Sequence, residues 1–213
     1  IMPSLVGSEM CIRDRSTVEA ATHVLATRFG GTPELSDPQD LGGSGSSMVL
    51  RCRISAEPFL QERTVVIKQL PRESESAGSD GNGFGPDALG MLREVVAYQY
   101  TNTLAESVRP GPVLLAYDIE QRLLVLSDAG DGTNFTDVLT LHDSKSRTGA
   151  LRKLGRSLGK MHAATFGGAD SYTTLMRRQC QRHQISPEAI EESDIDVGAV
   201  SYTHLTLPTS DLV

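Results

Sequence analysis

The stretch that decides the fold begins with the turn Gly42-Gly43-Ser44-Gly45-Ser46-Ser47 and continues, after one apolar run, to the strand Val65-Val66-Ile67-Lys68. Glycine lacks a Cβ atom, so the backbone N–H groups of such a turn can approach an anion closely, and serine hydroxyls add further donors. The strand is rich in β-branched residues and ends in a lone lysine. Together they predict a phosphate-binding turn with Lys68 as its counter-charge; a simple β-hairpin turn is the alternative.

Lys68 is expected to need an anionic partner, because alternate side chains of a buried strand point into the core, where an unpaired ammonium group is costly. Its other option is to extend to solvent at the end of the strand. A helix is predicted from Asp87 onward, since apolar residues recur at three- and four-residue spacing up to Leu104. Glu94 lies inside this helix. By itself Glu94 is typical of solvated surface, but its position favours pairing with Lys68.

The order of turn, strand, helix, two further strands and linker resembles the small lobe of the protein-kinase-like fold. Within that fold the chain resembles aminoglycoside phosphotransferases and related small-molecule kinases, through Arg93-Glu94-Val95-Val96-Ala97-Tyr98 and Leu124-Val125-Leu126-Ser127-Asp128-Ala129-Gly130. The resemblance runs from about residue 41 to residue 167. It implies an α+β fold with a small lobe at 16–126, built from an antiparallel sheet and one helix. A hinge at 127–132 and a truncated helical large lobe at 133–199 would follow.

The resemblance also implies roles for individual residues. The turn from Gly43 to Ser47 would cover the phosphates of ATP, Lys68 would hold the α- and β-phosphates, and Glu94 would orient Lys68. Residues 113–117 and 122–126 would be the fourth and fifth strands. Leu126, Ser127 and Ala129 would form the adenine site, with the backbone C=O of Ser127 and the N–H of Ala129 facing the base. Without the family context, the same segment is typical of an ordinary strand and a glycine-rich turn.

The turn departs from the glycine pattern of eukaryotic protein kinases at one position. Met48 stands where the third glycine would fall. This departure favours the small-molecule branch of the fold. The implied ligands are ATP, magnesium and an acceptor molecule that carries a hydroxyl group.

Composition narrows the class of protein. The 213 residues carry a formal net charge of −7 without a long basic run, which argues against a nucleic-acid partner. No stretch approaches the roughly 20 apolar residues that span a bilayer, so no transmembrane helix is expected. Cys11, Cys52 and Cys180 are scattered and show no CxxC spacing, which indicates neither a disulfide framework nor a zinc site. A reducing, cytoplasmic location is therefore expected.

Both ends of the chain differ in character from the rest. Residues 2–15 and 200–209 resemble peptides that recur at the ends of translated environmental reads on unrelated proteins, so 1–15 and 200–213 are interpreted as sequencing artefacts. A targeting peptide is the alternative for 2–15, but its apolar stretch is short and acidic residues are present. The first native helix is then predicted to begin at Ser16, which has capping-box spacing with Glu19, and to end at Gly30.

The remaining segments are predicted from composition and periodicity. Residues 72–85 are rich in Ser, Gly, Glu and Asp and predict a mobile loop rather than a calcium loop, because the calcium-ligand spacing and the closing glutamate are missing. Helices are expected at 134–141, 146–165 and 172–183. In the second of these, Gly155 and Gly159 predict close packing beside a leucine stripe, and His162 is interpreted as a packing or capping histidine. The third is expected to expose surface meant for missing partners.

The catalytic half of a kinase site is not found in the sequence. In the resembled family, a His-Gly-Asp loop followed by an asparagine supplies the catalytic aspartate and a magnesium ligand. Here His142-Asp143 precedes the long helix, and no asparagine follows it. Asp194-Ile195-Asp196-Val197-Gly198 faintly resembles the later magnesium motif, but acidic solvated surface is the better interpretation. No catalytic or metal-binding residue is therefore assigned.

The prediction is a truncated, inactive piece of an ATP-dependent small-molecule kinase. Two alternatives stay open. One is a pseudokinase-like nucleotide-binding module, and the other is a non-kinase α+β domain whose glycine turn is only a hairpin. The second alternative predicts that Lys68 and Glu94 lie far apart.

Overall fold

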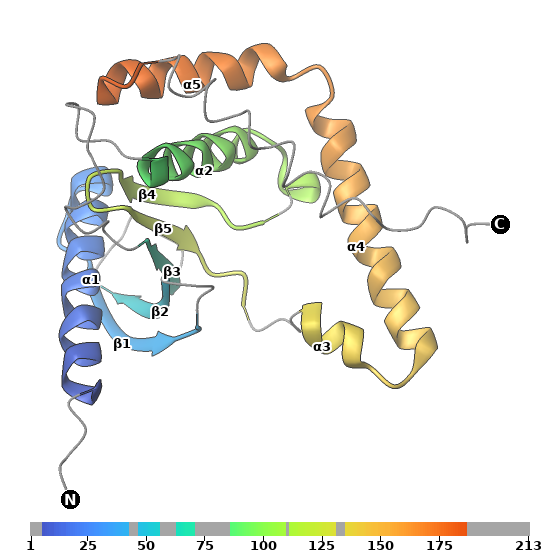
Figure 1. Ribbon diagram of the computed structural model, residues 1–213, viewed down its shortest axis with the longest axis horizontal. Helices are drawn as coiled ribbons and strands as arrows, with labels where there is room; N and C mark the ends of the chain where they lie inside the picture. Colours follow the sequence, from blue (N-terminus) through green and yellow to red (C-terminus); the bar gives the residue numbers. More distant parts are fainter. Residues whose placement is uncertain are drawn as a thin grey trace, which may run out of the picture.

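The chain folds as a mixed α+β protein with one antiparallel sheet (Figure 1). The computed structural model describes residues 6–42, 47–55, 63–70, 86–109, 111–130 and 135–186. Their elements, in chain order, are α1 Val6–Phe29, β1 Glu34–Asp40, β2 Met48–Ser55, β3 Thr64–Gln69, α2 Pro86–Asn102, the 3₁₀ turn η1 Glu106–Val108, β4 Leu114–Asp118, β5 Leu123–Ser127, α3 Phe135–Thr140, α4 Ser144–Thr165 and α5 Ala169–His183.

The five strands lie in the order β1-β2-β3-β5-β4, and every neighbouring pair is antiparallel. β1 is an edge strand that contains Pro38, and its register shifts between Ser36 and Gln39. Proline cannot donate a ladder hydrogen bond, so an edge strand with an irregular register is where a sheet tolerates it. The central position of β3 places Lys68 between Val49 of β2 and Leu124 of β5.

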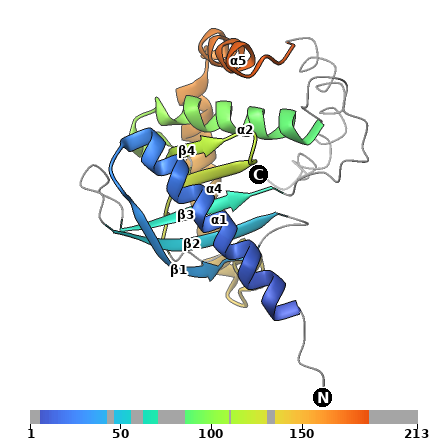
Figure 2. The same cartoon turned by 90° about the vertical axis from the view of Figure 1, so that its left-hand side faces the viewer.

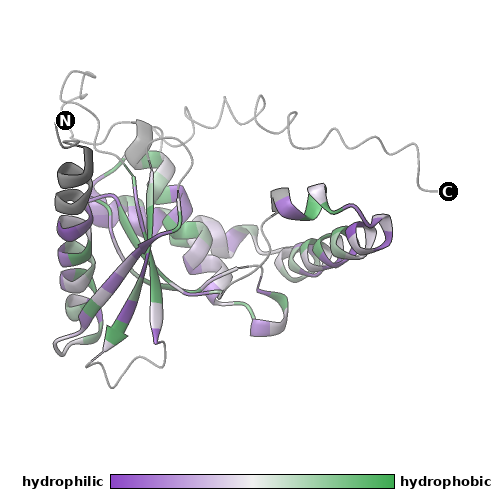
Figure 3. Ribbon diagram, turned by 90° about the horizontal axis from the view of Figure 1, so that it is seen from below, coloured by the Kyte–Doolittle hydropathy of each residue, from purple (hydrophilic) through white to green (hydrophobic). Residues whose placement is uncertain are grey.

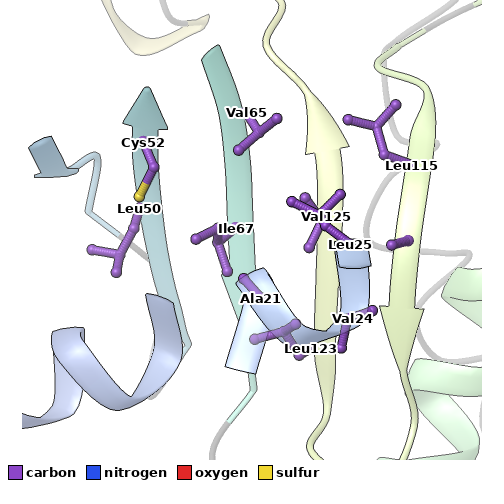
Figure 4. Close-up of a cluster of buried hydrophobic side chains, with 11 residues drawn as sticks. Ala21, Val24, Leu25, Leu50, Cys52, Val65, Ile67, Leu115, Leu123 and Val125 are labelled. Atoms are coloured by element: carbon purple, nitrogen blue, oxygen red, sulfur yellow. The ribbon is translucent and has the colours of Figure 1, made fainter. Parts of the chain in front are cut away.

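α1 covers one face of the sheet (Figures 2 and 4). Ala21 and Leu25 of this helix are fully buried against strand residues that include Val65 and Ile67. Side chains alternate along a strand, so these two β3 residues face α1 while Val66 and Lys68 face the opposite side. Alternate side chains of β3 therefore contribute to two different faces of the sheet: the core under α1, and a second face that carries Val66 and Lys68.

α2 packs on part of that second face, and α5 packs against α2 (Figure 1). The second core joins Leu92 and Val95 of α2 to Leu124 and Leu126 of β5, with Cys180 of α5 also buried in it. The expectation that residues 172–183 expose surface for missing partners is thus wrong for the side of α5 that carries Cys180. The helix is there, but that side is covered by α2.

α3 and α4 stand clear of the sheet (Figures 1 and 3). No residue of α4 is buried, and Leu151, Leu154 and Leu158 are 39%, 43% and 42% exposed. Positions Gly155 and Gly159 have no heavy atom within 4 Å of where a Cβ atom would lie, apart from their own chain neighbours and their own helix. The prediction that these glycines pack closely against a neighbour is therefore wrong within the described part of the chain.

The predicted first helix differs from the observed one at its start. α1 begins at Val6, so Ser16 lies inside the helix and does not cap it. Its end agrees with the prediction, because Gly30 follows the helix with a φ of 80°, a left-handed conformation that glycine adopts without strain. Thr17 connects the middle of α1 to β3: the residue is 1% exposed, and its hydroxyl donates to the side-chain oxygen of Gln69.

Candidate functional site

Lys68 and Glu94 form an ion pair at the second face of the sheet. The Nζ atom of Lys68 lies 2.7 Å from Oε1 and 2.9 Å from Oε2 of Glu94. The two side chains are 29% and 26% exposed, so the pair is partly shielded from water while solvent still reaches it. The pairing predicted from the sequence is confirmed. The separation of these two residues that the non-kinase alternative predicted is not found.

The local structure of α2 explains why Glu94 reaches the lysine. Met91, Leu92 and Val95 are fully buried on one side of the helix, which fixes how the helix is rotated on the sheet. Glu94 follows on the adjoining side of the same turn and is half-buried. Its carboxylate also affects Tyr98 one turn later: burial first, and then the negative charge of Glu94, raise the pKa of the Tyr98 hydroxyl. The carboxylate is therefore held in place by helix packing rather than by a mobile loop.

Lys68 keeps spare hydrogen-bonding capacity. An ammonium group has three N–H donors, and in the part of the chain that the structure describes Glu94 is its sole acceptor. The carboxylate of Glu94 holds the ammonium group in position but does not use all three of its N–H donors. An anion such as a phosphate oxygen could accept from the same nitrogen.

An elongated surface runs from Lys68 along β3. Because side chains alternate, Lys68, Val66 and Thr64 lie on one face at successive two-residue steps, and two steps of a strand span about 13 Å. Val66 lies between Arg51 of β2 and Leu126 of β5 in the sheet register. The surface thus carries the Lys68 to Glu94 ion pair at one end, is apolar in the middle and is polar at the other end.

The polar end is built around Asp128, directly after β5. The guanidinium group of Arg51 binds the carboxylate in two places, with Nε 2.9 Å from Oδ2 and Nη2 3.1 Å from Oδ1. The N–H of Gly130 donates to Oδ1 at 2.9 Å, and Gly130 has a φ of 80°. The side chains are 17% exposed for Arg51 and 10% for Asp128. This ion pair is more deeply buried than the one between Lys68 and Glu94.

Several donors act on the Asp128 carboxyl group. Burial by itself raises the pKa, but the hydrogen bonds from Gly130, Thr64 and Arg51, together with the positive charge of Arg51, outweigh it and lower the pKa. A cavity of about 560 Å³ lies beside this cluster, and its walls include Gln39, Arg51, Thr64, Asp128 and Gly130.

The predicted adenine residues occupy different environments. Leu126 is 5% exposed and belongs to the core under α2. Ser127 ends β5: its N–H donates to the carbonyl oxygen of Val113 at 2.8 Å, and its Oγ accepts from the N–H of Val113 at 2.8 Å. Ala129 follows on the exposed linker. The three residues therefore lie in sequence from core to surface at the polar end of the elongated surface.

The phosphate-binding turn falls mainly outside the described residues. Gly43, Ser44, Gly45 and Ser46 are outside them, whereas Ser47 is described and half-buried at the start of β2. The loop at 72–85 and the Asp194 to Gly198 stretch also lie outside the described residues. β2 places Ser47 two residues before Val49, the register partner of Lys68.

Residues near the expected catalytic side have structural roles. Asp143 is the N-cap of α4 and accepts from the backbone N–H groups of Lys145 and Ser146. The hydrogen bond from the Ser146 hydroxyl, followed by these backbone bonds, lowers the pKa of Asp143. His162 is exposed in the last turn of α4, so of the predicted packing or capping roles the packing role is wrong, whereas its position is the one that a capping histidine takes. Within the described ranges no group of three His, Cys, Asp or Glu side chains could hold a metal ion.

A second cavity of about 550 Å³ lies at the opposite sheet edge, between α1, α2 and β4. It adjoins a hydrogen-bonded cluster that ties three elements together. Tyr117 of β4 donates to Gln179 of α5 at 3.1 Å, and Gln179 donates to Gln99 of α2 at 2.9 Å. Gln179 is 7% exposed, so its amide is satisfied by this cluster. The cluster and the burial of Cys180 in the second core together hold α5 on α2.

Sequence reasoning missed the Arg51 to Asp128 pair. Arg51 stands in a strand between the buried residues Leu50 and Cys52. A charged residue in such a strand was the available signal, because it faces the side opposite its buried neighbours and calls for a partner there. Its partner is 77 residues away in the sequence, so no local pattern identifies it.

Comparisons with known proteins add no family to this picture. No family model and no curated protein matches the chain. None of the helices that the structure describes combines the length and the apolar character needed to cross a membrane.

Proposed function

We propose that this chain is the ATP-binding half of a phosphotransferase that moves the γ-phosphate of ATP to the hydroxyl group of a small molecule. Its sheet and α2 would be the small lobe of a protein-kinase-like fold similar to that of aminoglycoside phosphotransferases, and 133–199 would be part of a helical large lobe. The ion pair between Lys68 and Glu94 is the single observation that carries the proposal.

The order of chemical groups along the elongated surface supports ATP as the ligand. Lys68 at one end would bind phosphate oxygens while Glu94 keeps its Nζ atom in place. Val66, in the middle, offers an apolar surface to the flat base and ribose. The backbone groups of 127–130, at the polar end, would face the edge of the base. A phosphate, an apolar body and a hydrogen-bonding edge follow one another in ATP in the same order.

Magnesium would neutralise the phosphate charge during transfer. The described residues offer no cluster for it, so we assign no metal ligand in this chain. The proposal covers nucleotide binding by Lys68, Glu94 and the linker, and assigns no catalytic base. We expect the chain as given to bind ATP without transferring its phosphate.

The test is the affinity of the purified chain for magnesium-ATP, measured by isothermal titration calorimetry. We expect Lys68→Ala to weaken binding at least tenfold, which corresponds to about 1.4 kcal/mol. Lys153→Ala removes an equal charge from the exposed α4 helix and is the matched control, with unchanged affinity expected. Equal affinity in the wild-type chain and Lys68→Ala, or no binding by either, would overturn the proposal.

A further inference from the structure

The linker after β5 is held by a side-chain contact and not only by the sheet. β5 ends at Ser127, which pairs with Val65 of β3 in the sheet. Beyond that point, the two-point ion pair between Arg51 and Asp128 connects the linker to β2, the second strand away in the sheet. Thr64 of β3 also donates to Asp128. Side chains of β2 and β3 thus hold the linker that follows β5.

The geometry of the pair makes it a strong restraint on the linker. Arg51 contacts the carboxylate at two points, through a hydrogen bond from Nη2 to Oδ1 and an ionic contact between Nε and Oδ2, and two contacts from one planar group restrain orientation as well as distance. Asp128 also accepts from Gly130, so the same carboxylate fixes the turn of the linker itself. At 17% and 10% exposure the pair is shielded from the solvent that weakens surface ion pairs. Removing Arg51 would free the connection to β2, and removing the Asp128 side chain would free both that connection and the local turn.

We propose that Arg51 and Asp128 are positioning residues for the base end of the nucleotide site: their ion pair holds the linker at 127–130 in the conformation that presents its backbone groups to the base. This inference rests on the proposed function. Each end of the elongated surface is then positioned by its own ion pair. Lys68 and Glu94 set the phosphate end, and Arg51 and Asp128 set the base end two residue steps along the sheet.

The separation of the two ends makes the inference testable with parts of the ligand. When only a fraction of the molecules holds the binding-competent linker, the apparent affinity falls by that fraction. Arg51→Met is expected to lower the affinity for adenosine and for magnesium-ATP by the same factor, about tenfold. The affinity for tripolyphosphate should be unchanged. Lys68→Ala should show the reverse pattern, with weaker binding of ATP and tripolyphosphate and unchanged binding of adenosine.

Further variants separate positioning from a general loss of fold. Asp128→Asn keeps an acceptor for the N–H of Gly130 but removes the charge, and should match Arg51→Met; the double variant should be no weaker than either single one. Arg51→Lys retains the charge without the two-point geometry and should lose about threefold. Arg28→Met removes the same charge from exposed α1 on the other face of the sheet, and should bind all three ligands as the wild type does. Circular dichroism establishes that each variant is folded at the assay temperature.

The outcomes distinguish this inference from the proposed function. Failure of the wild-type chain to bind ATP and adenosine overturns the proposed function and the inference with it. Wild-type binding combined with unchanged adenosine affinity in Arg51→Lys and Asp128→Asn overturns the inference alone. A loss that is equal for adenosine and tripolyphosphate also overturns it, because it indicates general destabilisation and not a role at the base end.

Discussion

The strength of the Lys68 to Glu94 ion pair in solution can be measured by removing the charge from each residue in turn and then from both. The variants are Lys68→Met, Glu94→Gln and their combination, each close in shape to the residue it replaces. Together with the wild-type chain they form a double-mutant cycle, which isolates the interaction between the two side chains from their contacts with everything else.

The expected coupling follows from distance and exposure. Two unit charges 4 Å apart attract by about 4 kcal/mol at the effective dielectric near 20 that describes pairs close to a protein surface. The loss of hydration and the ordering of two long side chains offset much of this attraction. Measured coupling for fully exposed pairs is about 0.2 to 1 kcal/mol, and breaking a buried pair costs about 3 to 5 kcal/mol. With 29% and 26% exposure, the Lys68 to Glu94 pair should show a coupling of about 1 to 2 kcal/mol.

The assay is urea-induced unfolding followed by circular dichroism, with the free energy of unfolding extrapolated to water for all four proteins. The chain provides an internal control in Arg53 and Asp37, whose closest charged atoms lie 3.8 Å apart at 74% and 69% exposure. That exposed pair should show a coupling of about 0.3 kcal/mol or less. A Lys68 to Glu94 coupling no larger than the control value would refute the reasoning, because it would mean that the packing of α2 does not hold Glu94 against the lysine.

Two further predictions concern the core under α1. Leu25→Ala should lower the free energy of unfolding by about 3 to 4 kcal/mol, because the Leu25 side chain is fully buried between α1 and the sheet. Leu158→Ala on α4, where the side chain is 42% exposed, should lower it by less than about 1 kcal/mol. Equal losses for the two variants in urea unfolding would contradict the assigned packing. Burial, and then the negative charge of Asp14, raise the pKa of Cys52 to about 11 from an ordinary value of 9.0. In a chain carrying Cys11→Ser and Cys180→Ser, iodoacetamide at pH 8 should therefore alkylate Cys52 at least about tenfold more slowly in the folded than in the urea-unfolded state. Similar alkylation rates in both states would show that the thiol is accessible. Because the folded state binds the thiol proton more tightly than the unfolded state, the protonated Cys52 thiol favours folding; this contribution to the free energy of unfolding is fully present below about pH 9 and is lost as the pH rises towards 11.

Periodicity in the sequence was sufficient to predict most elements. The three- and four-residue spacing from Asp87 to Leu104 predicts a helix that the structure has at Pro86–Asn102. The strands expected at 113–117 and 122–126 are each displaced by one residue in the structure. These predictions succeed because amphipathic spacing is a local property of the chain. The start of α1 was wrong, since Ser16 and Glu19 have the spacing of a capping box in the middle of a continuous helix. A capping motif signals a possible helix start without requiring one.

Packing of whole elements was harder to predict. The leucines of α4 have the spacing of a buried stripe, yet they are partly exposed in the described structure. For α5 the expectation of exposure was wrong on one side only, where Gln179 joins it to Tyr117 of the sheet and to Gln99 of α2. Helical spacing shows that a helix has an apolar side, but which element covers that side depends on residues far away in the sequence.

The sequence by itself determined the alternation of β3, which sends Val65 and Ile67 to one face and Lys68 to the other, and it also indicated a carboxylate partner for that lysine in the next helix. Glu94 lies only 26 residues from Lys68, across a single strand-to-helix connection. The tertiary structure alone decided that Arg51 meets Asp128, because that contact requires β2, β3 and β5 to assemble side by side. Local spacing specifies the face on which a side chain lies, and only the assembled sheet specifies which distant residue shares that face.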